Sequence, residues 1–214
     1  MEINEAMKNV LFIGCHFDDI ERACGGTVKK LSGDNLNVFG LILTDTHYVR
    51  DEVVLRDKFT TKEEAQIASS ILNYKIHQLD YALNAVPYNE KLVYEIRNFI
   101  EERNIDTVFT HWEFDIHPDH KNCALCTLSA TRHIKNLFMY KSNFYDTSVG
   151  FEANFYIDVS SVYDFKKNAL FSFKSEIKRK GTNWLEIIFA YDKINGLKNN
   201  VCYAESFKVI KYIL

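Results

Sequence analysis

Two short apolar runs near the start of the chain constrain its fold more than any other feature. Residues 9–14 read Asn-Val-Leu-Phe-Ile-Gly, and residues 37–44 read Asn-Val-Phe-Gly-Leu-Ile-Leu-Thr. Both runs have the length and the continuous apolar character of strands buried on both faces of a sheet. A helix is expected between them, beginning at Gly25 and ending near Gly33 after a loop at residues 16–22, which implies a right-handed parallel crossover.

The alternation of strand and helix continues, and it predicts an α/β fold with a Rossmann-like, mostly parallel sheet flanked by helices. The chain has 214 residues and only two prolines, and it contains no internal repeat, so we expect a single domain over residues 1–214. Further strands are predicted at residues 75–81, 106–110, 137–140, 154–159 and 202–213. Further helices are predicted from Thr60 to near Asn73, and over 89–103, 122–132 (with Pro118 just before it) and 163–178. Residues 45–57 are expected to form a polar loop, and residues 179–200 have no clear pattern.

Composition and charge exclude several classes of protein. The chain is 47% hydrophobic and 26% charged, which is typical of a soluble globular protein, and its net charge of -3 predicts no nucleic-acid partner. No apolar run approaches the length of a membrane span, so stable membrane insertion is not expected. Five scattered cysteines, an odd number, indicate free thiols and a cytoplasmic location. The sequence leaves a homo-oligomer open.

Polar clusters follow the first and fourth predicted strands. His16, Asp18 and Asp19 come after the first, and the stretch His-Trp-Glu-Phe-Asp-Ile-His-Pro-Asp-His at residues 111–120 comes after the other. Ligands bind beyond the carboxyl ends of strands in open α/β sheets, so the two clusters are expected to converge. Imidazole and carboxylate groups are the ligands of catalytic zinc sites. The sequence therefore predicts a metal-dependent hydrolase.

Each group in these clusters has an expected role. His16, Asp19 and His120 are predicted to bind the metal, as a set of two histidines and one carboxylate. Asp119 is expected to orient one of the imidazoles. The alternative for any single histidine or aspartate after a strand is a turn or cap residue, and this is how we interpret the remaining histidines, His47, His77 and His133.

The catalytic groups are predicted from the same two clusters. Asp18 is expected to act as general base, because a metal lowers the pKa of its bound water to about 7 and a nearby carboxylate can then complete the deprotonation. His117 is expected to donate to the developing oxyanion and to be able to pass a proton to the leaving nitrogen. Arg50, His111 and Trp112 are candidate substrate contacts, and Trp112 is equally well explained as a core residue.

Two further motifs favour packing over chemistry. Cys123 and Cys126 form a Cys-x-x-Cys pair inside a predicted helix, with no second pair to complete a metal site. Gly25 and Gly26 lack the full Gly-x-Gly-x-x-Gly order of a dinucleotide site. Close packing of a helix on the first strand is the better interpretation, with phosphate binding at a helix start as the alternative.

At these residues the sequence resembles the PIG-L/LmbE-like family of metal-dependent N-deacetylases. The family's first motif, Ala-His-Pro-Asp-Asp-Glu with Gly-Cys-Gly-Gly-Thr after it, stands here as Cys-His-Phe-Asp-Asp-Ile at residues 15–20 and Ala-Cys-Gly-Gly-Thr at 23–27. The second motif, His-Pro-Asp-His, is intact at residues 117–120. Weaker similarities extend through the chain, including Lys166 and the Ala-Glu-Ser-Phe at 204–207.

The resemblance implies an LmbE-like fold and zinc-dependent removal of an N-acetyl group from an N-acetylglucosamine-type sugar or sugar conjugate, with another divalent metal as an alternative cofactor. By position, the resemblance implies the metal ligands and catalytic groups already named: His16, Asp19 and His120 as ligands, Asp18 as general base, and His117 as the oxyanion donor. Phe17, Ile20 and Thr46 depart from the family pattern without removing any of these groups, and they are expected to change the loop and the pocket wall. The alternatives are an amidase or esterase acting on a non-sugar substrate, a degenerate sugar-binding module, and a nucleotide-binding domain.

Overall fold

The computed structural model describes residues 7–34, 36–145 and 147–213, and its strands are built from the apolar runs of the sequence. A central sheet contains the strands β1 (Asn9–Gly14), β2 (Asn37–Thr44), β5 (Lys75–Tyr81), β6 (Thr107–His111), β7 (Asn136–Tyr140), β8 (Phe155–Asp158) and β9 (Ala204–Lys211). The helices are α1 (Asp19–Gly33), α2 (Lys58–Leu72), α3 (Glu90–Glu102), α4 (Pro118–Ala130), α5 (Tyr163–Phe171), α6 (Lys174–Lys180) and α7 (Asn183–Lys198), with a short 3-10 helix at Ser160–Val162. The predicted α/β fold with a mostly parallel sheet is confirmed.

The order of the strands creates a crevice at the edge where the site forms. The sheet runs β5-β2-β1-β6-β7-β9-β8, with β5 through β7 parallel and β9 antiparallel to both of its neighbours. The direction in which the chain adds strands reverses between β1 and β6. In an open α/β sheet this reversal opens a crevice beyond the carboxyl ends of the two strands. The two polar clusters of the sequence begin at the ends of β1 and β6.

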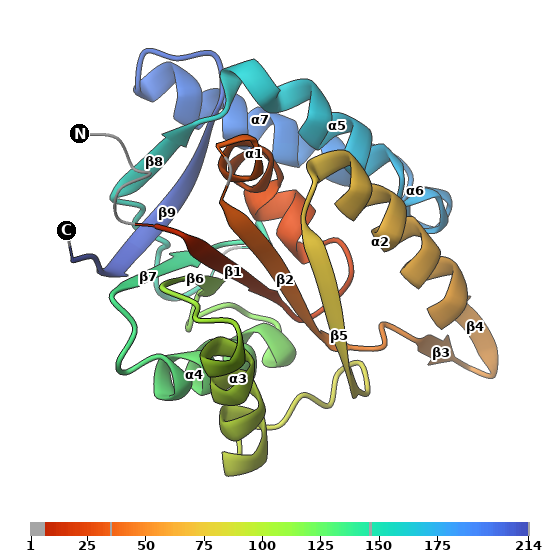
Figure 1. Ribbon diagram of the computed structural model, residues 1–214. Coiled ribbons are helices and arrows are strands. Elements are labelled where there is room, and N and C mark those ends of the chain that lie inside the picture. The colour runs from red at the N-terminus through yellow and green to blue at the C-terminus, as the bar shows by residue number, and fades with distance from the viewer. Residues whose placement is uncertain (1–6, 35, 146, 214) are drawn as a thin grey trace.

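Helices cover both faces of the sheet (Figure 1). Helices α3 and α4 pack on one face, and α1, α2, α5 and α7 lie on the other. Side chains of β1 alternate between the two cores, because Leu11 and Ile13 pack with α3 and α4 whereas Phe12 stacks on Phe109 at the opposite face. The predicted core role of the cysteine pair is confirmed, since both thiols are buried on α4. Within the described residues no helix has the length and apolar character needed to cross a membrane.

Helix α1 begins six residues earlier than predicted. We expected Gly25 to open it, but the helix starts at Asp19 and the glycine pair lies in its middle. Close packing explains the glycines, since a Cβ on Gly26 would lie 2.6 Å from the Cβ of Val159 and one on Gly25 would lie 3.0 Å from Lys166. The Glu205 carboxylate accepts hydrogen bonds from the backbone N–H groups of residues 26 and 27, at 2.8 and 2.7 Å. Close packing is therefore the reason for the glycines, but their partners are Val159 and Lys166 and not, as predicted, the first strand.

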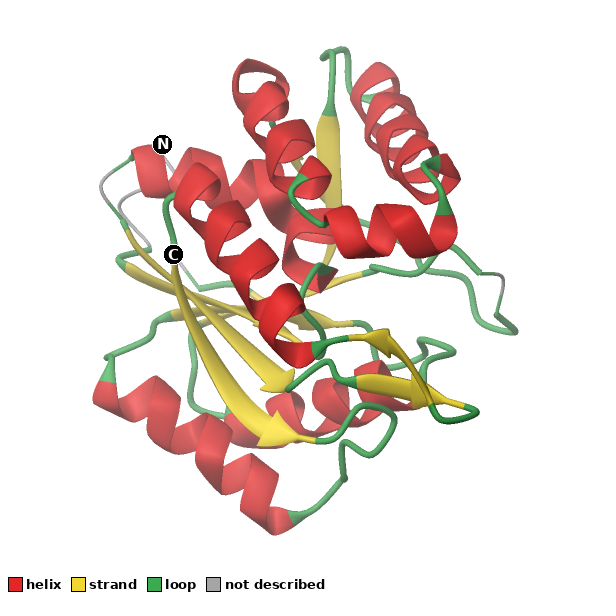
Figure 2. Cartoon of the chain, turned by 90° about the vertical axis from the view of Figure 1, so that its right-hand side faces the viewer, coloured by secondary structure: helices red, strands yellow, loops and turns green. Residues whose placement is uncertain are grey.

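The polar segment 45–57 is a hairpin and not only a loop. Strands β3 (Tyr48–Arg50) and β4 (Val53–Arg56) pair across a turn in which Asp51 and Glu52 both have positive φ. Turn residues of this backbone conformation are usually glycine or asparagine, so the sequence lacked the usual hairpin signal. Figure 2 shows that the hairpin lies beside the central sheet. Helix α2 then starts at Lys58 rather than Thr60, because the Asp57 carboxylate accepts the Thr60 N–H at 2.9 Å.

The C-terminal third differs most from the prediction. The helix expected over 163–178 is broken at residues 172–173 into α5 and α6, and the segment without a pattern contains α7. The buried face of α7 includes Asp192 and Asn195. These polar side chains interrupt the apolar pattern expected of a helix. Their partners lie on other elements: Asp192 pairs with Lys166 and accepts the Tyr163 hydroxyl, and Asn195 donates to Ser206.

We predict that Lys166→Met destabilises the fold by about 3–5 kcal/mol, because it leaves two buried carboxylates without their shared cation. Lys166 Nζ lies 2.6 Å from Asp192 Oδ2 and 2.7 Å from Glu205 Oε1, and all three side chains are buried. Urea unfolding measures the change. The matched control is Lys167→Met on the same helix, whose surface pair with Asp164 contributes about 0–1 kcal/mol. Equal stability of the two variants would contradict the prediction.

Candidate active site

The loop between β1 and α1 turns sharply and brings three side chains to one side. Asp18, at the N-cap position of α1, adopts φ 105°, a left-handed conformation that costs a non-glycine residue about 1–3 kcal/mol. The carboxylate of Asp19 holds the turn, because its Oδ2 accepts the backbone N–H groups of Cys15 at 3.1 Å and His16 at 2.9 Å. His16, Asp18 and Asp19 all line the same cavity as a result.

The second cluster is organised by the start of α4. Asp115 Oδ1 accepts the backbone N–H of His117 at 2.8 Å, and His117 occupies the N-cap position, where its Nδ1 accepts the Asp119 N–H at 3.2 Å. Pro118 is the first helical residue, where its missing N–H costs nothing. The first turn of α4 therefore directs His120 back toward the end of β1.

Three predicted ligand atoms meet between the two clusters. His16 Nδ1 and His120 Nε2 each lie 3.3 Å from Asp19 Oδ2, and the two nitrogens are 3.2 Å apart. A metal held tetrahedrally by bonds of about 2.0–2.1 Å requires its ligand atoms to be about 3.3–3.4 Å apart. The residues present fit a metal ion of this kind, with two imidazoles and one carboxylate and one side facing the cavity.

The imidazoles of His16 and His120 each contact a further carboxylate through the ring nitrogen that points away from Asp19. Asp119 Oδ2 lies 3.0 Å from His16 Nε2, and it also accepts the backbone N–H of Asn84 at 2.7 Å. Asp115 Oδ2 lies 3.1 Å from His120 Nδ1. Such contacts fix the ring and leave its other nitrogen free to bind a metal. Asp115 was not predicted from the sequence, although its position two residues before His117 could have indicated it.

The charges of the cluster suit a cation. Burial opposes ionisation of Asp19, but the neighbouring imidazoles of His120, His111 and His16 hold the pKa of its carboxyl well below the usual range. Burial likewise lowers the pKa of His120, yet the Asp19 and Asp115 carboxylates outweigh it and raise that pKa to about 10. The carboxylate at the centre is therefore ionised, and opposite charge is attracted to it.

Asp18 and His117 flank the ligand cluster in the cavity wall. Burial raises the pKa of Asp18, and the guanidinium groups of Arg56 and Arg22 oppose that shift. Because His117 Nδ1 accepts a hydrogen bond, the proton of the neutral ring is on Nε2. The ring centroid of His117 is 4.9 Å from that of His16 and 4.7 Å from that of His120, so it lies beside the ligand cluster.

The cavity has a volume of about 440 Å³, within the range of small-molecule sites. Polar and charged side chains are the majority of the residues in its wall. Besides the residues named above, it is lined by Arg22, Tyr48, Arg56, Leu83, Asn84, Ile116, Pro118, Asn143, Tyr145, Glu176, Arg179 and Lys180. None of the four cations among them was predicted from the sequence, because they come from three separate segments without a shared motif.

None of the three candidate substrate contacts is among the side chains that line the cavity. Arg50 is exposed on the hairpin, where it pairs with Asp51, and its neighbour Tyr48 is the residue that lines the cavity. Trp112 is buried in a small core cluster with Ala124, in agreement with its alternative interpretation. His111 is fully buried beneath the ligand cluster, with Nε2 3.2 Å from Asp19 Oδ2.

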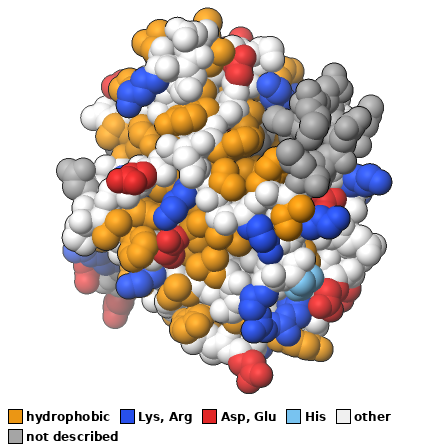
Figure 3. Space-filling view, turned by 90° about the vertical axis from the view of Figure 1, so that its left-hand side faces the viewer, with side chains coloured by type: hydrophobic (Ala, Val, Ile, Leu, Met, Phe, Trp, Pro, Cys, Tyr) orange, Lys and Arg blue, Asp and Glu red, His pale blue; other side chains and the backbone are white. Residues whose placement is uncertain are grey.

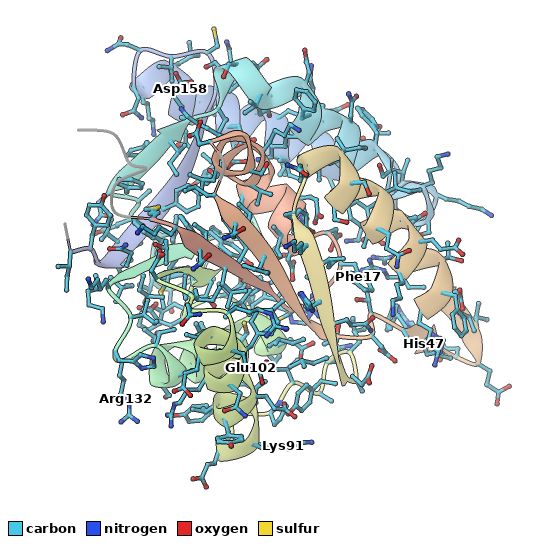
Figure 4. The ribbon with its side chains drawn as sticks, in the orientation of Figure 1. Phe17, His47, Lys91, Glu102, Arg132 and Asp158 are labelled. Carbon is cyan, nitrogen blue, oxygen red and sulfur yellow. The ribbon has the colours of Figure 1, made fainter. Side chains whose placement is uncertain are left out.

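The departures from the family pattern lie beneath the site. Phe17 is buried, and Figure 4 places it between β5 and α2. Ile20 is buried against Gly14, and Thr46 has φ 58°, a conformation that favours the glycine usually found there. Thr46 Oγ1 accepts the backbone N–H of Phe17 at 3.2 Å. None of the three is among the side chains that line the cavity. These substitutions can therefore change the shape of the cavity only by shifting the loop between β1 and α1.

Comparisons with known proteins agree with the geometry. Residues 11–131 match the model of the PIG-L family, described as GlcNAc-PI de-N-acetylase. A diacetylchitobiose deacetylase of Thermococcus kodakarensis is 27% identical over 235 residues, covering 98% of this chain and 86% of the relative.

Solved structures share the fold at lower identity. An N,N'-diacetylchitobiose deacetylase from Pyrococcus horikoshii has a TM-score of 0.81 at 20% identity, covering 96% of this chain and 85% of that one. GalB from Pseudomonas putida, a 4-carboxy-2-hydroxymuconate hydratase, has a TM-score of 0.82 at 14% identity, covering 97% and 98%. Proteins with different reactions thus share this fold, and the side chains of the site must decide the chemistry.

We predict that Asp115→Asn weakens the binding of a divalent metal about 10- to 100-fold, because a neutral amide supports the His120 imidazole less well. Competition with a chelating dye, using Zn²⁺ or Co²⁺ as the probe, measures the affinity. Glu113→Gln in the same loop is the matched control, since Glu113 pairs with Lys208 and not with a ligand. Wild-type affinity in Asp115→Asn would show that this carboxylate does not support the site.

Proposed function

This chain belongs to the PIG-L family of de-N-acetylases, and we propose that it is a zinc-dependent hydrolase that removes the N-acetyl group from an acetamido sugar or sugar conjugate. The observation that carries the proposal is the meeting of His16, Asp19 and His120 atoms within 3.3 Å of one another. A base and a hydrogen-bond donor, Asp18 and His117, lie beside them in one cavity.

The ligand set favours zinc, which binds two imidazoles and a carboxylate in several classes of hydrolase, although other divalent transition metals accept the same donors. When bound, the ion would polarise the amide carbonyl and lower the pKa of water. The protein's own contribution is to hold the ligands in place through Asp115 and Asp119.

Asp18 and His117 have complementary tasks in this reaction. The Asp18 carboxylate takes a proton from the water that attacks the amide carbon. The Nε2–H of His117 donates to the oxygen on which negative charge develops, and the Nδ1 contact with helix α4 keeps this proton on the correct nitrogen. When the C–N bond breaks, the proton held by Asp18 passes to the leaving nitrogen, so that acetate and an amine are released.

The cavity wall supports a sugar substrate. Tyr48, Asn84, Asn143 and Tyr145 offer hydroxyl and amide groups that suit the hydroxyls of a pyranose ring. Related deacetylases act on diacetylchitobiose, whose units carry the same acetamido group. These observations favour an acetamido sugar over a hydrophobic amide.

We predict that zinc-loaded protein releases acetate from N-acetylglucosamine derivatives and that removing either catalytic group nearly abolishes the release. His117→Ala is expected to lower kcat about 100- to 1000-fold through loss of an oxyanion donor. Asp18→Asn is expected to lower it about 100- to 10,000-fold through loss of the base. Acetate is measured in a coupled assay, and bound zinc is measured in the same samples.

The control for these variants is His133→Ala, which removes an exposed histidine away from the cavity. Both catalytic variants are expected to retain one zinc per chain, because neither residue is a proposed ligand. Near-normal rates in His117→Ala or Asp18→Asn would overturn the role assigned to that residue. Zinc-loaded protein that releases no acetate from any acetamido sugar would overturn the proposed substrate class.

A further inference from the structure

Helix α7 carries apolar side chains on two opposite sides. Its buried side includes Leu185, Ile188, Asp192, Asn195 and Gly196. Because a helix has about 3.6 residues per turn, the opposite side of α7 is the one that faces outward. Four apolar residues lie on this outer side, and we call them the α7 stripe: Ile187, Ala190, Ile194 and Leu197.

No described part of the chain covers the α7 stripe. The side chains of Ile187, Ile194 and Leu197 are 52%, 50% and 63% exposed, and Ala190 is exposed as well. Moving apolar surface of this kind out of water and into a contact is favourable. A second apolar surface of matching shape would therefore bind here.

The spacing of the α7 stripe distinguishes it from other exposed apolar side chains. Single apolar residues on a surface are common and do not identify an interface. On the face that Figure 3 shows, for example, hydrophobic side chains reach the surface among charged ones. The members of the α7 stripe are three, four and three residues apart, which is the repeat with which one helix packs along another. The pattern therefore indicates a helix as the partner.

The charges at the two ends of α7 favour a second copy of the same helix in the opposite direction. Glu186 lies in the first turn and Lys198 in the last, and both are exposed. An antiparallel pair places the acidic end of each helix near the basic end of the other, with the helix dipoles opposed. A parallel pair would instead place acid beside acid and base beside base.

We propose that α7 is an interface between two copies of this chain, which pack as an antiparallel helix pair about a two-fold axis. In the register that overlaps the whole α7 stripe, Ala190 of each copy packs against Ile194 of the other beside the axis. Ile187 then packs against Leu197 toward each end. The small side chain of Ala190 allows the two helices to approach closely. A two-fold contact of this kind is closed, so the assembly formed through α7 is a dimer.

The dimer is expected to be weak, because a pair of 16-residue helices is a short contact of about 24 Å. Interfaces of this size lie at the small end of those that are stable, and we expect a Kd of about 1–100 µM. Sedimentation equilibrium over a series from about 1 to 300 µM should show monomer converting to dimer. Protein that stays monomeric throughout this series would overturn the inference.

A variant in the α7 stripe tests which surface forms the dimer. Ile194→Glu places two carboxylates in the centre of the helix pair and should raise Kd at least about 100-fold. Ile67→Glu is the matched control, because Ile67 is 55% exposed on α2, outside the stripe, and this variant should keep the wild-type Kd. Circular dichroism and thermal unfolding verify that both variants are folded. An oligomer that survives Ile194→Glu would show that α7 is not the interface.

A charge exchange tests the direction of the two helices. Glu186→Lys should raise Kd about 3- to 10-fold, because it places like charges together at both ends of the pair. Adding Lys198→Glu to the same chain restores opposite charges and should return Kd to near the wild-type value. High salt should reduce the difference between these proteins. A double variant as weak as the single one would contradict the antiparallel arrangement.

Disulfide cross-linking gives a second measurement of direction. Cys202, which is exposed, is first replaced in a Cys202→Ser background. Chains with Ile187→Cys are then mixed with chains carrying Leu197→Cys and mildly oxidised, and linked heterodimers are expected. Linked homodimers from each chain alone, without heterodimers, would indicate a parallel pair and overturn the inference.

Binding to a lipid surface is the outcome that would reassign the α7 stripe. Vesicles of phosphatidylcholine and phosphatidylglycerol are the probe, and the dimer predicts no sedimentation of the protein with them. Wild-type protein that stays monomeric and sediments with the vesicles, while Ile194→Glu does not, would make the stripe a lipid-binding face. The proposed deacetylase reaction is unaffected by either result, since no member of the stripe lines the cavity.

Discussion

The carboxylate of Asp19 is the interaction on which the site depends. One of its oxygens accepts two backbone N–H groups from the end of β1 and lies within 3.3 Å of His16 and His120. It therefore shapes the turn, starts helix α1 and gathers the predicted ligands, which belong to segments about a hundred residues apart. The His111 imidazole makes a second link between the two clusters, because its Nε2 accepts the Cys15 N–H at 3.2 Å.

Helix α1 is fixed at two points, and each involves a buried carboxylate. Asp19 holds its first residue at the site, and Glu205 holds its middle through the backbone N–H groups of residues 26 and 27. Lys166 balances the second carboxylate in the interior. The weak similarities to the family near residues 166 and 204–207 thus have a physical basis, because Lys166 and Glu205 anchor the helix that begins at the predicted metal ligand Asp19.

The fold and the chemistry are separate properties of this chain. The same sheet topology occurs in deacetylases and in a hydratase, so the crevice at β1 and β6 provides a place for a reaction and does not specify which one. Specificity must come from side chains around the crevice. Here these are polar groups near the ligands and the cations Arg56, Arg179 and Lys180 around the buried Glu176.

The sequence by itself determined the parallel sheet and the two clusters at its edge, and it predicted His16, Asp19 and His120 as metal ligands, because strand periodicity and ligand chemistry are local properties. It did not reveal the start of α1, since the reason for the glycines lies in contacts with Val159 and Lys166 from far along the chain. It missed α7, whose buried face is polar, and the hairpin, whose turn lacks glycine. Only the tertiary structure decided that cations from α1, β4 and α6 share a wall, because no short-range pattern records which distant segments will meet.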